Sequence, residues 1–196
     1  MTPAPTADET RARIVTEAER LFRHYGYSKT TVADIADACA MSSANVYRFF
    51  ASKSAINEAI CGAIISNFEG QLHKVANSDM PASGRLTQLI ELLARNTAEM
   101  LSHEKKVHEM VVVAMEENWG AIGRHLDFIE ALIASIVASG IASGEFRRQD
   151  PKQAARCIHF ALAGLKHPVI AAQCACRPDT PTPSEMAAFI LSALKA

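Results

Sequence analysis

The chain has 196 residues, of which 49% are hydrophobic, and its formal net charge is -1. This length is enough to bury a sizeable core and accommodates one small and one larger module. The near-zero charge excludes a strongly basic coat that binds nucleic acid non-specifically, and no run of residues alternates as a strand does, so we expect an all-α protein.

Cysteine usage and hydropathy indicate the compartment. The five cysteines are an odd number scattered along the chain, and the start lacks the charged and apolar regions of a secretion signal. No run approaches the roughly 18 apolar residues that a membrane helix needs. We therefore expect a cytoplasmic protein in a reducing environment, without membrane contact.

The first predicted helix follows a proline-containing leader of six residues. It begins near Asp8 and ends at Tyr25, where Gly26 serves as the C-cap. Its apolar residues recur as one stripe, which should support the next two helices from behind. The stripe consists of Ile14, Val15, Ala18, Leu21, Phe22 and Tyr25.

Residues 27–53 contain two short helical patterns on either side of a break. Thr30 or Thr31 can cap the first helix, with Asp34 in the capping-box position after Thr31. Ser42 can cap the second helix after a short turn. Two short helices joined in this way form a helix-turn-helix.

The second of these helices, Ser43 to Phe49, has a small and polar first turn. Such an end can approach base edges in the major groove without a bulky side chain in the way. Ser52 and Lys53 begin the next helix, where the helix dipole and an ammonium suit a phosphate. The pattern therefore predicts DNA binding.

Several motifs at fixed spacing resemble the TetR family of bacterial transcriptional regulators over roughly residues 10 to 60. The motifs are A-x-x-L-F from residue 18, G-Y from residue 26, T-T-V-x-D-I-A from residue 30 and S-x-A-N-V-Y-x-F-F-x-S-K from residue 42. Where the family usually has glycine in the turn, this chain has Ala40. An alanine at positive φ would cost on the order of 1 kcal/mol.

The resemblance implies particular contacts with DNA. It implies phosphate contacts for Thr31, Tyr47 and Lys53, and positions facing base edges or nearby backbone for Ser43, Ala44 and Arg48. The predicted DNA-binding residues are Thr30, Thr31, Ser42, Ser43, Ala44, Asn45, Tyr47, Arg48 and Lys53.

Charge in the N-terminal region is balanced. Residues 1 to 58 contain seven basic residues (Arg11, Arg13, Arg20, Arg23, Lys29, Arg48, Lys53) and seven acidic residues (Asp8, Glu9, Glu17, Glu19, Asp34, Asp37, Glu58). DNA binding must therefore depend on the local arrangement of a few cations.

A connecting helix is predicted from Ser52 to Ala76, a rod roughly 35 Å long. Residues 77–84 are the expected linker. Helical apolar spacing then recurs over residues 86–97, 107–114 and 122–137, and a break follows at residues 140–144.

Two helices are predicted near the C-terminus. The first starts at Asp150 and Pro151 and is interrupted at His167 and Pro168, because proline removes an amide donor. After a loop over residues 177–182, the last helix has Thr182 as its N-cap, Pro183 in its first turn and Glu185 completing a capping box.

We therefore predict an N-terminal helix-turn-helix DNA-binding domain over residues 1–51. A larger helical ligand-binding and dimerisation domain follows over residues 52–196, in which residues 52–76 form the connecting helix. The resemblance implies a homodimer through residues 151–175 and 183–195. The predicted function is a ligand-responsive repressor, released from operator DNA by a small apolar or amphipathic effector and needing no cofactor.

The effector site is assigned from residue type. Methionine and aromatic side chains suit an apolar cavity wall and histidines suit polar anchors, although each is more often an ordinary core or structural residue. The candidates are Met100, His103, Met110, Met115, Trp119, Phe128, His159 and Phe160, with His108 and His125 as further polar anchors.

Three alternatives remain open at this stage. Cys157, Cys174 and Cys176, with His159 and His167 nearby, could sense metal or oxidant, although C-x-C is not the common zinc spacing. A helical module could use the same surface for a protein partner. An enzyme is disfavoured, because no nucleophile with a paired base, phosphate-cradling loop or metal triad has a recognisable spacing.

Overall fold

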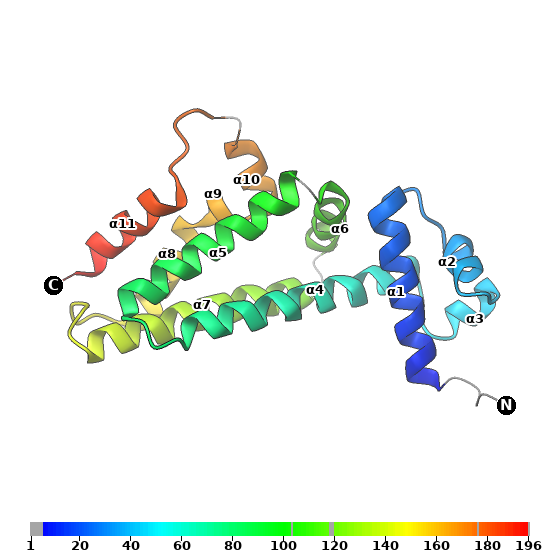
Figure 1. The fold of residues 1–196 in the computed structure, drawn as a ribbon, viewed down its shortest axis with the longest axis horizontal. Coiled ribbons are helices and arrows are strands. Elements are labelled where there is room, and N and C mark those ends of the chain that lie inside the picture. The colour runs from blue at the N-terminus through cyan, green and yellow to red at the C-terminus, as the bar shows by residue number, and fades with distance from the viewer. Residues whose placement is uncertain (1–5, 103, 118–119, 176, 196) are drawn as a thin grey trace. The chain divides into compact units, whose positions relative to one another are not determined.

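The computed structural model describes residues 6–102, 104–117, 120–175 and 177–195. His103, Trp119 and Cys176 lie outside the described residues. All regular structure in these ranges is helical, as predicted (Figure 1). The helices are α1 (Ala7–Tyr25), α2 (Val32–Ala38), α3 (Ser43–Tyr47), α4 (Lys53–Ala76), α5 (Ala82–Ser102), α6 (Lys105–Glu116), α7 (Gly120–Ala142), α8 (Pro151–Ala161), α9 (Ala163–Lys166), α10 (Pro168–Cys174) and α11 (Pro183–Leu194).

Capping residues predicted the helix starts well. Thr31 forms the capping box of α2 with Asp34, and Ser42 accepts a hydrogen bond from the amide of Asn45 at the start of α3. Asp150 caps α8, and Thr182 forms a second predicted box at α11. Each cap satisfies amides that have no partner within the helix, so the boundary is fixed locally.

Three predicted boundaries were wrong. The linker is shorter than expected, because α5 already begins at Ala82. Helix α7 continues through Gly140, which is buried and lies against the ring of Phe146, so the glycine provides space rather than a break. The C-terminal helix also divides at Leu162 into α8 and α9, an interruption that contains no proline and that the sequence did not reveal.

Helix α7 is more apolar than the sequence analysis expected. Among the described helices it alone reaches the length and mean hydropathy, 1.5 over its best window, of a membrane-spanning segment, and only 33% of that window is buried. Its residues Ile129, Ile133, Ile136 and Val137 nevertheless belong to a hydrophobic core cluster. A core helix passes the same test, so this feature alone does not indicate a membrane span.

The chain forms two compact units. Unit 1 consists of residues 1–65 and 104–121, and unit 2 of residues 66–103 and 122–196. The division falls inside α4 rather than at residue 51, and α6 belongs with the N-terminal helices. The chain therefore passes between the units three times, after residues 65, 103 and 121.

Unit 1 has its own apolar core. Ile14 and Phe22 of α1, Ile35 of α2, Ile60 of α4 and Met110 of α6 are all fully buried. Helix α1 contacts both α2 and α6, and α2 contacts α3. The predicted packing of α1 against the first short helix is confirmed, the second short helix packs on α2, and α6 is an additional member of this unit.

Unit 2 is built around α5, which contacts α9, α10 and α11. Its core joins residues of α4, α5, α7, α8 and α11, among them Leu72, Leu89 and Ile133. At one end, the Glu145 carboxylate accepts hydrogen bonds from the amides of Ala82 and Ser83. These bonds lower the pKa of Glu145 to about 2, so it caps α5 as a charged group over the whole neutral range.

The turn between α2 and α3 generates a stability prediction. Ala40 has φ 50°, the left-handed region in which a Cβ is strained. We expect Ala40→Gly to raise the free energy of unfolding by about 1 kcal/mol, measured by urea denaturation with circular dichroism. Ala12→Gly, at an exposed position inside α1, is the control and should lower it by a similar amount; stabilisation by both changes would contradict the strain.

Candidate nucleic-acid interface

Helix α3 is too short to be stable alone, so its neighbours determine its position. It has five residues, and Val46 is fully buried beneath it. The turn before it is closed by the amide of Met41, which donates to the carbonyl of Ala36 at 2.9 Å. Phe50 is buried directly after the helix. Val46 within α3 and Phe50 after it therefore hold α3 against the rest of unit 1.

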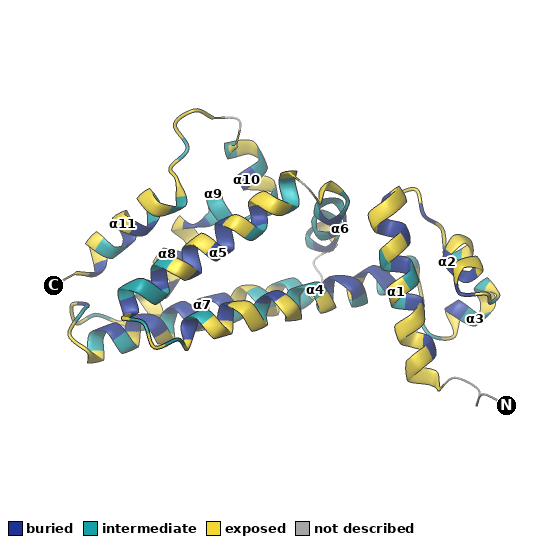
Figure 2. Ribbon diagram, in the orientation of Figure 1, coloured by how far each residue is buried: buried dark blue, intermediate teal, exposed yellow. Residues whose placement is uncertain are grey.

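The outer side of α3 is exposed (Figure 2). Ala44, Tyr47 and Arg48 are exposed, and Ser43 and Asn45 are partly so. Tyr47 has 52% of its surface accessible although it is a large hydrophobic side chain. A slim N-terminal end with an exposed tyrosine and arginine behind it has the form of a recognition helix that enters the major groove.

The hydroxyl residues before α2 and α3 have structural partners. Thr31 and Ser42 cap the two helices and remain exposed. Thr30 is different, because its side chain is buried and its hydroxyl donates to the carbonyl of Gly26 at 2.9 Å. The prediction that Thr30 contacts DNA is therefore corrected: this residue closes the turn after α1.

Two basic residues, Lys53 and Arg11, form hydrogen bonds inside unit 1. Lys53 Nζ donates to the carbonyls of Tyr27 at 2.9 Å and Thr30 at 3.1 Å, and lies 4.2 Å from the centroid of the Tyr27 ring. Arg11 donates to the carbonyl of Phe49 at 2.7 Å and lies over the ring of Phe50. Neither role is predictable from the sequence, because each joins residues far apart in the chain.

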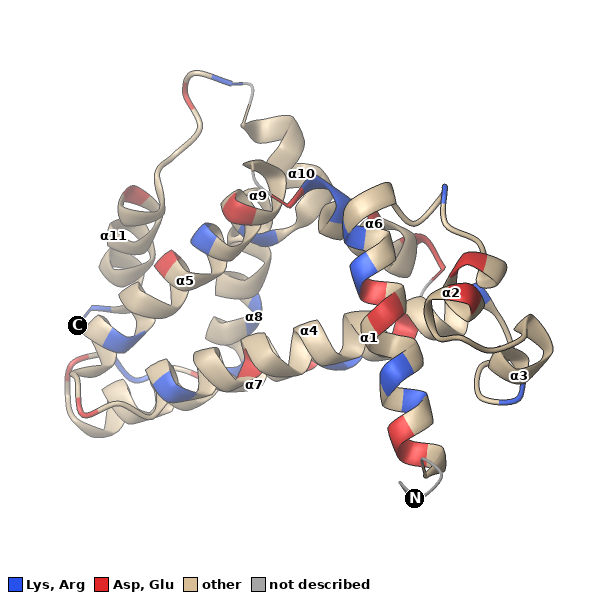
Figure 3. Ribbon diagram, turned by 45° about the vertical axis from the view of Figure 1, so that its right-hand side comes forward, with Lys and Arg blue, Asp and Glu red and all other residues tan. Residues whose placement is uncertain are grey.

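Charges near the reading surface are consequently few. Figure 3 shows both signs along α1 and only acidic charge on α2, which contains Asp34 and Asp37. Arg48 directly follows α3 and Lys29 precedes α2, and both are exposed. Arg48 therefore supplies an exposed cation beside α3 and Lys29 supplies one before α2, while the charge of the surrounding residues is balanced.

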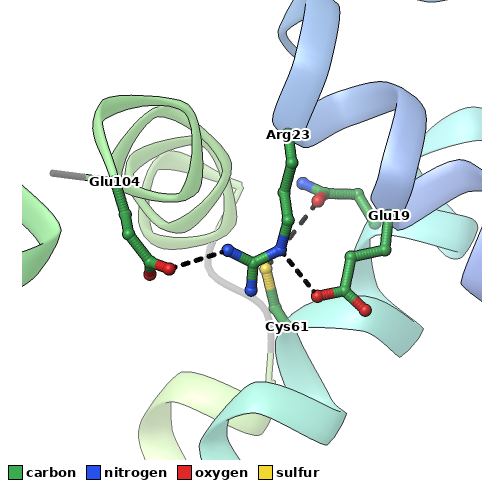
Figure 4. A network of polar contacts seen from close by, with 5 residues as sticks. Glu19, Arg23, Cys61 and Glu104 are labelled. Carbon is green, nitrogen blue, oxygen red and sulfur yellow. Dashed lines mark hydrogen bonds and ion pairs between the residues drawn. The ribbon is translucent and has the colours of Figure 1, made fainter.

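Helix α6 is joined to α1 and to the turn after it by polar contacts. Arg23 of α1 lies between Glu19, at 2.8 Å, and Glu104, at 3.0 Å (Figure 4). The Ser28 hydroxyl donates to Glu109 at 2.6 Å, and this bond lowers the pKa of that carboxyl group.

The same helix also contacts α4. Ser54 donates to Glu117, and the Asn57 amide donates to the carbonyl of Met110 at 3.4 Å. The polar contacts of α6 therefore join it to α1, to the turn at Ser28 and to α4. The chain continues into unit 2 at both ends of α6.

The predicted effector residues do not gather in one unit. Met110, fully buried, and Met115 belong to unit 1. Met100 and Phe128 belong to unit 2, where Phe128 packs against the core. His159 and Phe160 are also in unit 2.

The prediction that Phe160 lines an effector cavity is not supported. Its side chain is 73% exposed in the subunit, so it does not line an enclosed apolar cavity there. His159 is partly buried and makes a contact with Lys166 that the sequence did not suggest.

The cysteines show no metal cluster in the described part of the chain, where no three His, Cys, Asp or Glu side chains are placed to hold an ion. Cys157 is exposed on α8 and Cys174 is partly exposed on α10. Cys61 is buried in unit 1, and burial raises the pKa of its thiol to about 12, so it stays protonated.

Together the fold and α3 define a helix-turn-helix DNA-binding protein with a larger helical domain. Residues 14–60 match the model described as bacterial regulatory proteins of the tetR family, and residues 82–185 match the model of a tetracyclin repressor-like C-terminal domain. The second match spans more than half of the chain. This protein belongs to the TetR family and is a DNA-binding regulator of transcription.

Similar proteins agree with this assignment. The transcriptional repressor KstR2 of Rhodococcus jostii is 24% identical over 156 residues, 75% of each chain. A transcriptional regulator from Cytophaga hutchinsonii has the same fold with a TM-score of 0.70 at 22% identity, over 93% of this chain and 97% of that one. SmeT, the repressor of a Stenotrophomonas maltophilia multidrug efflux pump, has a TM-score of 0.67 at 20% identity, over 95% and 90%.

Lys53 generates a prediction with two readouts. Lys53→Met removes two hydrogen bonds to backbone carbonyls and the contact with Tyr27, so we expect a loss of roughly 1 to 2 kcal/mol of unfolding free energy. If Lys53 also contacts a phosphate, affinity should fall for all DNA sequences alike and the salt slope should decrease by about one.

The control is Lys29→Met, at an exposed lysine near the same turn. It should leave the free energy of unfolding unchanged. Unchanged stability in Lys53→Met would contradict the structural role, and a loss confined to some DNA sequences would contradict the phosphate contact.

Proposed function

We propose that this protein is a homodimeric repressor that acts in the cytoplasm and is released from its operator by a small apolar or amphipathic effector. Each α3 reads one half-site in the major groove, and the effector binds in the larger helical domain. The observation that carries the proposal is the exposed, slim-ended α3 held firmly on its inner side, in a chain of the TetR family.

Roles within the reading surface follow from side-chain chemistry. Arg48 has a planar group with several donors that suits guanine edges or phosphates, and Ser43 and Ala44 allow the helix end to come close. Tyr47 and Lys53 suit phosphate contacts, which fix the position of the helix without reading sequence. In a dimer the two α3 helices would lie in half-sites about one helical turn, roughly 34 to 36 Å, apart or somewhat wider.

The surface for a second subunit is formed by α8 and α11. Phe160 on α8 and Phe189 on α11 are 73% and 67% exposed, unusual for phenylalanine. A groove of about 440 Å³ between these helices is lined by apolar residues including Ile158, Ile190 and Ala193. Pairing two copies through α8 and α11 would bury both phenylalanines and gives a symmetric interface.

Release by the effector requires coupling between the units. The polar contacts of α6 with α1, the turn at Ser28 and α4 provide it, because both ends of α6 continue into unit 2. An effector that prefers a different arrangement of these segments by a few kcal/mol would change the separation of the two α3 helices. This role requires binding alone and no catalysis.

The reading role of α3 is tested by operator selection from a randomised DNA pool. Arg48→Gln should change the preferred bases within each half-site, because glutamine pairs with adenine edges while arginine pairs with guanine. Arg13→Gln, at an exposed position on α1, is the control and should select the wild-type sites. An unchanged preference for the Arg48 variant would remove the base-reading role, and failure of the wild-type protein to select any site would remove the function.

The dimer is tested by a charge placed at its centre. Phe189→Asp should give a monomer in analytical ultracentrifugation and lower operator affinity by at least tenfold, because a desolvated carboxylate opposes pairing. Its folded content should stay unchanged, since Phe189 is exposed in the subunit. Ala98→Asp, at an exposed position on α5, should remain a dimer; a dimeric Phe189 variant would place the interface elsewhere.

A further inference from the structure

Unit 2 contains a lysine whose ammonium forms no ion pair with any carboxylate of the described residues. Lys166 ends α9 and is partly buried, and its Nζ lies 3.2 Å from Nε2 of His159 on α8. The ion pairs among the described residues all involve other cations, so no described carboxylate lies within 4.0 Å of this ammonium. Its backbone carbonyl is already used, because it accepts from the Thr97 hydroxyl at 3.2 Å.

The contact with Lys166 fixes the state of His159. An ammonium can only donate, so Nε2 must accept and Nδ1 must carry the hydrogen. Burial, followed by the charge of Lys166, lowers the pKa of His159 to about 4, so the ring is neutral at pH 7. Nδ1 is itself buried and has no hydrogen-bond partner among the described residues. The pair therefore offers donors without acceptors.

Neighbouring charges do not compensate Lys166. His125 on α7 is paired with Glu69 on α4 at 3.0 Å, which occupies that carboxylate. Burial, with a smaller contribution from Lys166, lowers the pKa values of His125 and His167, so both rings are largely neutral at pH 7. The cluster is Lys166, His159, His125 and His167 with Glu69 and Asp127; its positive charge at pH 7 is that of Lys166, and neither carboxylate forms an ion pair with this ammonium in the described structure.

We propose that Lys166, held by His159, anchors an anionic head group of the effector, such as a carboxylate. This inference rests on the proposed function and adds the chemical class of the effector. An uncompensated, partly buried ammonium is unfavourable in the free protein and becomes favourable when an anion supplies acceptors. Phe68 belongs to the hydrophobic core, and Phe128 and Leu165 pack against it, on helices that also carry Glu69, His125 and Lys166. The rest of the effector would therefore be apolar.

A first experiment needs no effector. Burial lowers the pKa of Lys166 from 10.5 to about 8, so the unfolded chain binds more protons between these values and stability rises with pH there. Lys166→Met should therefore raise Tm at pH 7, and the gain should shrink as the pH passes from 8 to above 10.5. Lys152→Met, at an exposed lysine of α8, should change Tm little at any pH; a lower Tm of Lys166→Met at pH 7 would show that the charge is already compensated.

A second experiment uses decanoate and its neutral amide, decanamide, as probes in isothermal titration calorimetry at pH 7. The wild-type protein and Lys152→Met should bind decanoate about tenfold more tightly than decanamide, the effect of one charge-assisted hydrogen bond. Lys166→Met should lose this preference and Lys166→Arg should keep it. Equal affinities in the wild type, a preference that survives in Lys166→Met, or no binding of decanoate would each overturn the proposal.

Operator binding is measured in parallel, because it distinguishes a failure of the proposed repressor function from a failure of the proposed anionic effector class. Failure of the wild-type protein to bind any operator would contradict the proposed repressor function. Release from the operator by neutral compounds alone, with the same response in Lys166→Met, would leave the function intact and overturn only the anionic class.

Discussion

The short helix α3 depends on constraints that its own five residues do not provide. A helix of this length has too few internal hydrogen bonds to persist in water, so its orientation comes from Val46 below it, the cap at Ser42 before it and Arg11 at its C-terminal end. Lys53 fixes the preceding turn through two carbonyls. The outer side of α3 is therefore free to contact DNA, because positioning relies on groups that face inward.

These inward contacts reduce the number of cations in unit 1 that are available to contact DNA. Of the seven basic residues in the first 58, Arg11 bonds to a backbone carbonyl, Lys53 to two, and Arg20 and Arg23 pair with glutamates. Arg48 and Lys29 remain exposed beside the two short helices. A few free cations in fixed positions give little non-specific attraction, so discrimination between sequences has to come from the shape and chemistry of α3.

The sequence was informative wherever a structure is determined by neighbouring residues. Thr31, Ser42, Asp150 and Thr182 predicted helix starts because a cap bonds within three residues, and Ala40 adopts the positive φ that the turn required. Tertiary pairings could not be predicted: Lys53 with Tyr27, α6 with α1, and Lys166 with His159 each depend on how separate helices and turns pack. The prediction for Thr30 was wrong because the sequence does not distinguish a buried threonine from an exposed one.

The reading surface depends on neighbouring residues, whereas the cluster around Lys166 depends on the packing of separate helices. The reading surface is one continuous stretch, so its motif, its caps and its exposed side chains could be identified together, while the cluster around Lys166 in unit 2 draws on α4, α7, α8 and α9. Lys166 forms no ion pair with a described carboxylate, although the chain has 21 acidic residues, so the free subunit keeps a partly buried charge that destabilises it. Such a cost is typical of binding sites, where groups are arranged for a ligand rather than for the free protein. The uncompensated ammonium therefore indicates ligand chemistry more specifically than the apolar residues around it, which serve equally well as core.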